Sequence, residues 1–158
     1  MTDCFHLAQL NVATILAPLD HPRMAEFVGA LDRINALAEA SPGFVWRLRD
    51  DSGNATALRP FGPEMLVNMS VWESAETLAD YVYRSQHARY LARRKEWFAM
   101  PSAAYLALWW IPSGSRPTLE KAKRRLDLLQ ARGPSPEAFT LTRRFQPPVE
   151  APALAEAP

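Results

Sequence analysis

The chain has 158 residues, a formal net charge of +1 and a hydrophobic content of 48%. This length suits one globular domain with its own core, and the small net charge gives no reason to expect a nucleic-acid partner. A single cysteine excludes an internal disulfide framework and a cysteine-based metal cage. No apolar run could span a bilayer and the first residues lack a secretory signal pattern, so we expect a cytoplasmic protein without a membrane partner.

The first third of the chain reads as strand, helix, strand. Residues 5–13 (FHLAQLNVA) suit a strand. Residues 22–40 carry an apolar stripe at helical spacing, and the Ser-Pro-Gly that follows predicts the end of that helix. A second strand is predicted over 44–49 (FVWRLR), with one face made by Phe44, Trp46 and Leu48.

The middle of the chain repeats this alternation. Residues 65–72 (MLVNMSVW) predict a third strand by their period of two. Ser74 is a suitable N-cap for one long or broken helix that reaches Phe98. Residues 103–111 (AAYLALWWI) predict a fourth strand, which Pro-Ser-Gly ends.

The C-terminal part adds one helix to this pattern. Residues 118–132 suit a helix with Gly133 at its C-cap, and 139–145 suit a short extra strand or an extended arm. We therefore expect one domain over 1–145, including this helix, and a disordered Pro-, Ala- and Glu-rich tail over 146–158.

The order strand, helix, strand, strand, helix, strand is that of the ferredoxin-like split βαβ sandwich, an α+β fold with an antiparallel sheet. In that fold the first and third strands are central neighbours. Gln9 and Asn11 would then share a face with Asn68 and Ser70. Polar side chains in the middle of a sheet are unfavourable unless they bond to one another or to a ligand.

The fourth strand predicts a partner. It is apolar on both faces, whereas a ferredoxin-like sheet has helices on one face only. We therefore expect a homodimer formed through the sheets, including one face of the Tyr105–Ile111 strand.

The second helical region carries the first candidate site residues. His87, Leu91, Arg94 and Phe98 recur at helical spacing, so a histidine and an arginine share a stripe that should face a core. His87 suits a general base, and Arg94 suits the stabilisation of an anion. The competing interpretations are a histidine bonded to a backbone carbonyl and an arginine paired with a helix carboxylate.

Two further groups are candidates. Asn11 and Asn68 could donate hydrogen bonds to a substrate oxygen, or instead form an amide ladder between strands or polar contacts inside a dimer barrel. Aromatic side chains could line a pocket for a flat substrate, although packing is the competing use of such residues. The aromatic candidates are Trp46, Trp72, Tyr90, Trp97 and Trp109. The three histidines lack metal-ligand spacing, so we expect no dedicated metal site.

Several stretches together carry a family resemblance: HLAQLNVA, SPGFVWRL, NMSVWES, the run from His87 to Phe98, LWWIPSG and GPSPEAF. Between His6 and about Phe145 the chain resembles a bacterial domain family of unknown function in the dimeric α/β-barrel superfamily. That superfamily includes the antibiotic-biosynthesis monooxygenases. The resemblance implies a ferredoxin-like subunit that pairs sheet to sheet with a second copy and holds a small molecule between sheet and helices.

The resemblance also implies a range of functions. The first is a small enzyme of the monooxygenase-like class that oxidises or rearranges an apolar or aromatic metabolite without metal or other cofactor. His87 would be the base, and Asn11, Asn68 or Arg94 would stabilise the anion. The alternatives are a haem protein that uses His87 as axial ligand, and a non-catalytic binding or structural dimer module. Fold alone does not choose among them.

Overall fold

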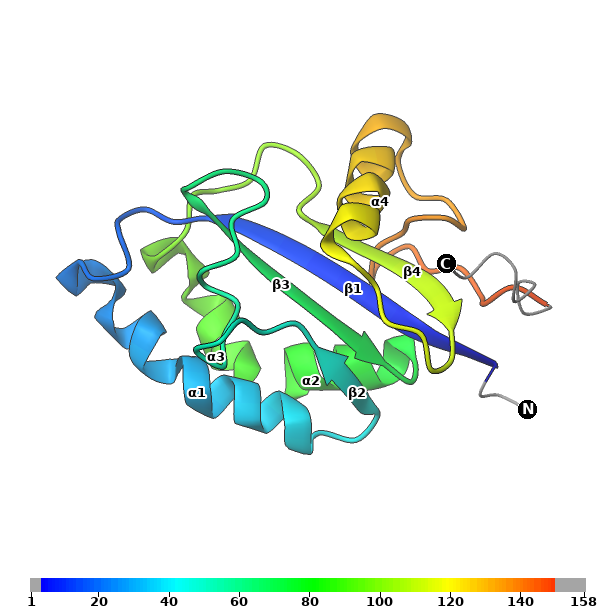
Figure 1. Ribbon diagram of the computed structural model, residues 1–158, viewed down its shortest axis with the longest axis horizontal. Coiled ribbons are helices and arrows are strands. Elements are labelled where there is room, and N and C mark those ends of the chain that lie inside the picture. The colour runs from blue at the N-terminus through cyan, green and yellow to red at the C-terminus, as the bar shows by residue number, and fades with distance from the viewer. Residues whose placement is uncertain (1–3, 150–158) are drawn as a thin grey trace.

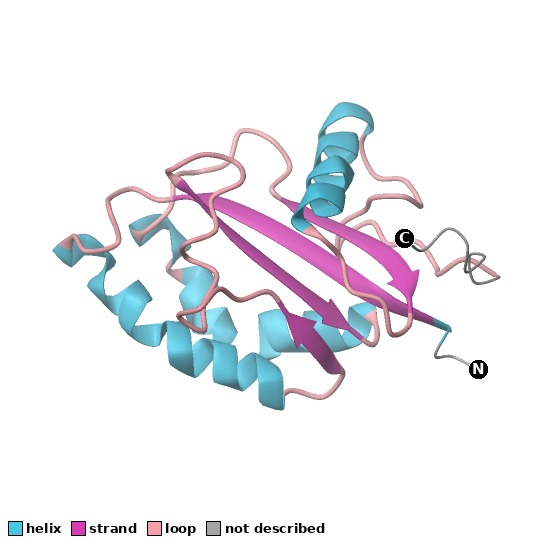
Figure 2. Cartoon of the chain, in the orientation of Figure 1, coloured by secondary structure: helices cyan, strands magenta, loops and turns pink. Residues whose placement is uncertain are grey.

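The computed structural model describes residues 4–149, and the elements follow the predicted order (Figure 1 and Figure 2). The main elements are β1 (Phe5–Thr14), α1 (Ala25–Ala40), β2 (Phe44–Arg47), β3 (Met65–Trp72), α2 (Ala75–Arg84), α3 (His87–Ala92), β4 (Leu106–Pro112) and α4 (Leu119–Arg132). Two 3-10 turns, η2 (Pro22–Met24) and η3 (Arg94–Glu96), precede α1 and follow α3. No helix within 4–149 is long and apolar enough to cross a membrane.

The four strands form one antiparallel sheet in the order β2-β3-β1-β4. This is the order of the split βαβ fold, and it confirms the predicted ferredoxin-like α+β class. The central pair β1 and β3 is in a register that places Gln9 opposite Ser70 and Asn11 opposite Asn68. The polar residues of both strands therefore meet on one face of the sheet, as the alternation predicted.

Both faces of the sheet are covered by helices of the same chain. Figure 1 shows α1, α2 and α3 on one side and α4 on the other. One cluster joins the sheet to α2 and includes Leu7, Trp72, Leu78 and Leu108. The other joins it to α4 and includes the buried side chains of Leu10, Met69, Trp109, Leu126 and Leu129.

The expectation of a bare sheet face is therefore wrong. Ala107 and Trp109 of β4 are buried against α4, and Leu58 and Phe61 of the β2–β3 connection pack on the same cluster. The added C-terminal helix occupies the face on which we expected a second copy. That the protein forms a homodimer stays a prediction, to be tested by light scattering of the purified chain.

A bulge in β2 changes which of its side chains face α1 to α3 and which face α4. Phe44 pairs with Trp72 and Trp46 pairs with the adjacent Val71, so one residue of β2 is left without a partner. Such an extra residue reverses the alternation beyond it. Phe44 consequently packs on the α2 side whereas Trp46 packs on the α4 side, which corrects the prediction that they share a face.

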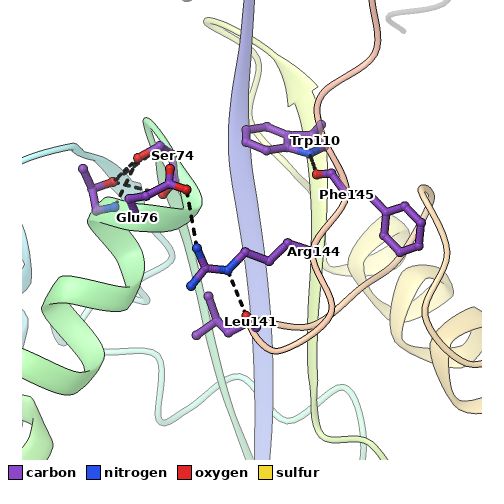
Figure 3. A network of polar contacts seen from close by, with 7 residues as sticks. Ser74, Glu76, Trp110, Leu141, Arg144 and Phe145 are labelled. Carbon is purple, nitrogen blue, oxygen red and sulfur yellow. Dashed lines mark hydrogen bonds and ion pairs between the residues drawn. The ribbon is translucent and has the colours of Figure 1, made fainter.

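The segment after α4 returns to the free edge of the sheet. Leu108 and Phe139 exchange two backbone hydrogen bonds, each 2.8 Å long. Figure 3 shows the next contacts: the indole N–H of Trp110 donates to the carbonyl of Phe145 at 2.8 Å, and Arg144 lies 3.4 Å from Glu76 of α2. Residues 139–145 thus form an extended arm that joins β4 to α2.

Two C-terminal deletions test whether this arm stabilises the fold. Deleting 150–158, which lie outside the described residues, should leave the melting temperature within about 2 °C of wild type. Deleting 139–158 removes the fully buried side chain of Phe139 together with the rest of the arm, and should lower the melting temperature by on the order of 10 °C. Thermal denaturation of both proteins tests this, and a large loss on the shorter deletion would show that the tail docks.

Candidate functional site

A cavity of about 210 Å³ lies between the sheet and the helices α1 to α3. We call it the sheet–helix cavity. All four predicted catalytic residues line it, from four different elements: Asn11 of β1, Asn68 of β3, His87 of α3, and Arg94 of η3. The two asparagines therefore face the helices, so the interpretation in which they point into a dimer barrel is wrong.

The floor of the cavity is a chain of polar side chains on the two central strands. The amide nitrogen of Gln9 donates to Asn68 Oδ1 at 2.5 Å and to Ser70 Oγ at 2.8 Å, and the indole N–H of Trp72 also donates to Ser70 Oγ at 2.8 Å. Gln9 and Ser70 are 4% and 7% exposed, so these bonds satisfy groups that have little access to water.

The hydrogen bonds among these polar side chains leave other donors free at the cavity. Asn68 accepts from Gln9 through its oxygen, and its side-chain N–H groups have no bonding partner among residues 4–149, so they stay available. Asn11 is half-buried, and its side chain bonds to no other side chain or backbone group within residues 4–149. The amide-ladder interpretation thus holds for Gln9 and Asn68, while Asn11 is a polar group that faces the cavity without a partner in the described chain.

A serine breaks the second helical region and sets the position of His87. Ser85 Oγ donates to the Tyr81 carbonyl at 2.5 Å, which competes with the next turn of α2, and it accepts from the His87 backbone N–H at 3.1 Å. The chain restarts as α3 at His87. The Ser-x-His spacing therefore has a local role: it turns the helix so that the histidine begins a new one beside the cavity.

The His87 ring is held in one tautomer. Its Nδ1 lies 3.2 Å from the Val82 carbonyl, which can only accept, so Nδ1 carries the proton and Nε2 is unprotonated. Burial lowers the pKa of His87 below the ordinary histidine value of 6.5, an effect that the Val82 carbonyl opposes. His87 is thus neutral at pH 7 and has a basic nitrogen free.

An aromatic wall supports this ring. Tyr81 lies between His87 and Trp72, with ring centroids 4.9 Å from the first and 5.1 Å from the second. The Tyr81 hydroxyl donates to the carbonyl of Ile34 in α1 at 3.3 Å, and burial raises the pKa of this phenol, so it stays protonated. The wall therefore fixes the base against an uncharged apolar surface.

The two neighbouring arginines that follow α3, Arg93 and Arg94, have different roles. Arg93 binds both carboxylate oxygens of Glu26 at 2.8 and 2.9 Å and also pairs with Glu96 at 2.8 Å, so its role is structural. Arg94 has no carboxylate partner among the described residues; its guanidinium donates to the Leu91 carbonyl at 3.0 Å. The paired-arginine interpretation is wrong for Arg94, whose charge is available to the cavity.

Sequence reasoning did not single out a second arginine at the cavity. Arg47 lines it with a side chain that is 11% exposed, and Glu39 of α1 neutralises it at 2.9 Å. Strict alternation did not identify Arg47 as a site residue, because the bulge in β2 decides which face its side chain reaches. The positive charge without a carboxylate partner at this cavity is accordingly that of Arg94.

Four of the five predicted aromatic residues lie elsewhere, and Trp72 is the one that lines the cavity. Trp46 and Trp109 belong to the cluster under α4, because the bulge and the alternation of β4 turn them to that face. Tyr90 and Trp97 stack on each other with centroids 6.1 Å apart, and Trp97 is buried against Phe27 of α1. Packing is therefore the observed use of these four.

Neither a metal nor haem is suited to this set of residues. Within residues 4–149 no three histidine, cysteine or acidic side chains gather as a metal site would require. His87 Nε2 could serve as an axial ligand, but a cavity of about 210 Å³ is smaller than the roughly 300–1,000 Å³ that drug-sized ligands occupy. A haem macrocycle is larger still, so the haem alternative is not supported.

The chain was compared with curated proteins and with solved structures. No curated protein matches it. A cofactor-independent oxygenase, SnoaB from Streptomyces nogalater, aligns at 18% identity and a TM-score of 0.45 over 72% of this chain and 96% of its own. Rv0793 from Mycobacterium tuberculosis aligns at 14% identity and a TM-score of 0.45 over 72% of this chain and 99% of its own.

A third solved structure, NE2512 from Nitrosomonas europaea, is a protein of unknown function that aligns at 13% identity and a TM-score of 0.45, over 73% of this chain and 96% of its own. The family comparison reaches further along the sequence than these structures do. One family model matches residues 6–155, nearly the whole chain, which confirms the resemblance to a domain family of unknown function. The chain belongs to the family described as Domain of unknown function (DUF3291).

Proposed function

We propose that the chain is a small enzyme of the monooxygenase-like class that removes a proton from an apolar or aromatic metabolite. The observation that carries this is His87, which lines the sheet–helix cavity as a neutral base with Nδ1–H fixed by the Val82 carbonyl. A base of lowered pKa against an apolar wall, beside groups that can bind an anion, is the arrangement that proton abstraction requires.

Each polar group has a role in this proposal. His87 Nε2 takes a proton from an acidic carbon or a phenol of the substrate. The free N–H groups of Asn68 and the guanidinium of Arg94 then stabilise the resulting anion. These groups bind the charged intermediate more strongly than the neutral substrate, so they accelerate the proton transfer. Trp72 and Leu78 exclude water from the apolar part of the substrate.

The electron-rich anion is the species that reacts with oxygen. In oxidation of a methylene group, O2 is the oxidant: one oxygen atom enters the product as a carbonyl and the other leaves as water. Where oxygen does not react, the same anion permits a rearrangement. The protein supplies the base and the stabilising donors in both cases, and it needs no bound metal for the proton transfer.

The second candidate is a binding module without chemistry. It is favoured by the ladder of Gln9, Asn68 and Ser70, whose side chains already satisfy one another in part. A binder would use the same apolar wall and the same charge but would have no need of a basic nitrogen held in one tautomer.

Incubation with a panel of ionisable aromatic metabolites under air separates the two candidates. We expect oxygen uptake, or an isomer of unchanged mass, for at least one compound, with the product identified by mass spectrometry. Saturable quenching of tryptophan fluorescence by ligands that are all recovered unchanged would support the binding module instead. Titration with haemin, followed by visible absorption, should give no stoichiometric complex, because the sheet–helix cavity beside His87 is too small for the macrocycle.

A further inference from the structure

A second hollow of about 270 Å³ lies at the end of the sheet, beneath the segment 98–105 that leads into β4. We call it the end hollow. Apolar side chains dominate its lining, among them Met65, Phe98 and Met100, and Met100 is 76% exposed. A single exposed methionine needs no explanation, but this one borders a hollow that other apolar side chains also line, and contiguous apolar surface of this kind suits a ligand.

The two hollows adjoin. Arg94 and Tyr105 line both of them. No hydrogen bond ties the Tyr105 hydroxyl to another group within residues 4–149, and the guanidinium of Arg94 is bonded to one backbone carbonyl. A cation and a hydroxyl, both with unused hydrogen-bonding capacity, therefore stand where the sheet–helix cavity meets the end hollow.

We propose that the cavity and the end hollow form one elongated site for an amphipathic carboxylate. The carboxylate lies at Arg94 and Tyr105, so in this site the guanidinium binds the carboxylate and the free N–H groups of Asn68 are the donors that stabilise the anion of the reacting part beside His87. An apolar arm lies in the end hollow. The position of the reacting part rests on the function proposed above. The charge at the junction and the apolar arm rest on Arg94 and on the lining of the end hollow.

Charge decides in favour of an anion. Glu39 neutralises Arg47, and His87 is uncharged, so Arg94 sets the sign of the field at the junction. A guanidinium binds a carboxylate through two parallel N–H groups, which a neutral hydroxyl cannot match. A cationic ligand would meet repulsion at the same place.

The test uses unreactive probes, so that binding is measured apart from turnover. The probes are a series of ω-phenylalkanoates of increasing chain length and the corresponding ω-phenylalkanols, with Kd measured by calorimetry on the full chain. We expect alkanoates to bind more tightly than alkanols of equal length. We also expect affinity to rise by roughly threefold to fourfold per added methylene until the end hollow is filled.

Two substitutions separate the two parts of the proposal. Arg94→Gln should weaken alkanoates by roughly 10–100-fold and leave alkanols within about threefold. Lys95→Gln removes a neighbouring charge that lines neither hollow and should change nothing. Ala103→Trp fills the end hollow from an exposed position and should abolish the gain with chain length, whereas Ala36→Trp, exposed on α1, should not.

Equal affinities for alkanoates and alkanols, or a chain-length series that is flat in the wild-type protein, would overturn the proposal. Either result would leave proton abstraction by His87 standing if turnover is found. Conversely, the expected affinities without any turnover would support the elongated site and remove the proposed reaction. The two failures are therefore distinguishable.

Discussion

Replacing His87 with alanine is expected to reduce turnover by about 10²–10⁴-fold, the usual contribution of a positioned general base. The ring lines the sheet–helix cavity, and its basic nitrogen is the one unprotonated imidazole nitrogen there. Binding should survive, because the apolar wall and Arg94 are untouched. The measurement is the rate of product formation, with Kd for the same compound measured alongside.

A matched pair of variants keeps this test specific. His87→Gln can still donate from its amide to the Val82 carbonyl but offers no basic nitrogen, so it should be as inactive as the alanine variant while it stays better folded. Gln86→Ala changes the exposed neighbour, which does not line the cavity, and should have wild-type activity. Lost stability with unchanged turnover in His87→Ala would make the histidine structural.

The pH profile follows from the direction of the pKa shift. Burial lowers the pKa of His87 below 6.5, so the base is unprotonated at neutral pH. The value of kcat/KM should be constant across pH 7–8 and fall in acid, as the histidine gains a proton. The contribution of His87 to the free energy of unfolding should follow the same direction, because the unfolded chain binds the proton more readily than the folded chain. This contribution is fully present above about pH 6.5 and is lost as pH falls through the lowered pKa of the folded state.

The second large effect concerns α4, and Leu126→Ala is expected to destabilise the fold by about 2–5 kcal/mol. Leu126 is buried against the sheet with Leu129 and Trp109, on the face where a ferredoxin-like subunit would otherwise be open. The melting temperature should fall by on the order of 10 °C. Thermal denaturation followed by circular dichroism measures it.

The neighbouring residue provides the control for α4. Asp127 is exposed on the same helix and should tolerate alanine with a change of less than about 0.5 kcal/mol. If Leu126→Ala were as harmless as Asp127→Ala, then α4 would not hold the core, and the sheet face would again be open to a partner. Light scattering on both variants would show whether a second copy takes the place of the helix.

Local patterns in the sequence were enough for the fold and for much of the site. The alternation in 5–13 and 65–72 assigns Gln9, Asn11, Asn68 and Ser70 to one face, and the topology of the split βαβ fold makes those strands neighbours. The cap at Ser74 follows from the same local chemistry: its hydroxyl accepts from the Thr77 N–H at 3.1 Å. These features depend on residues close together along the chain or on a period of two, so the sequence shows them directly.

Tertiary structure decided the features that depend on long-range packing. The apolar stripe of 118–132 shows an amphipathic helix but not the surface that it covers, and its docking on the second sheet face replaced the predicted subunit interface. The bulge in β2 depends on register with β3, so the sequence did not reveal that Trp46 would lie on the α4 face of the sheet and not on the face covered by α1 to α3. The pair of Arg93 with Glu96 is local, but its second partner, Glu26, is 67 residues away, and the lack of a carboxylate beside Arg94 among the described residues likewise depends on how the helices pack.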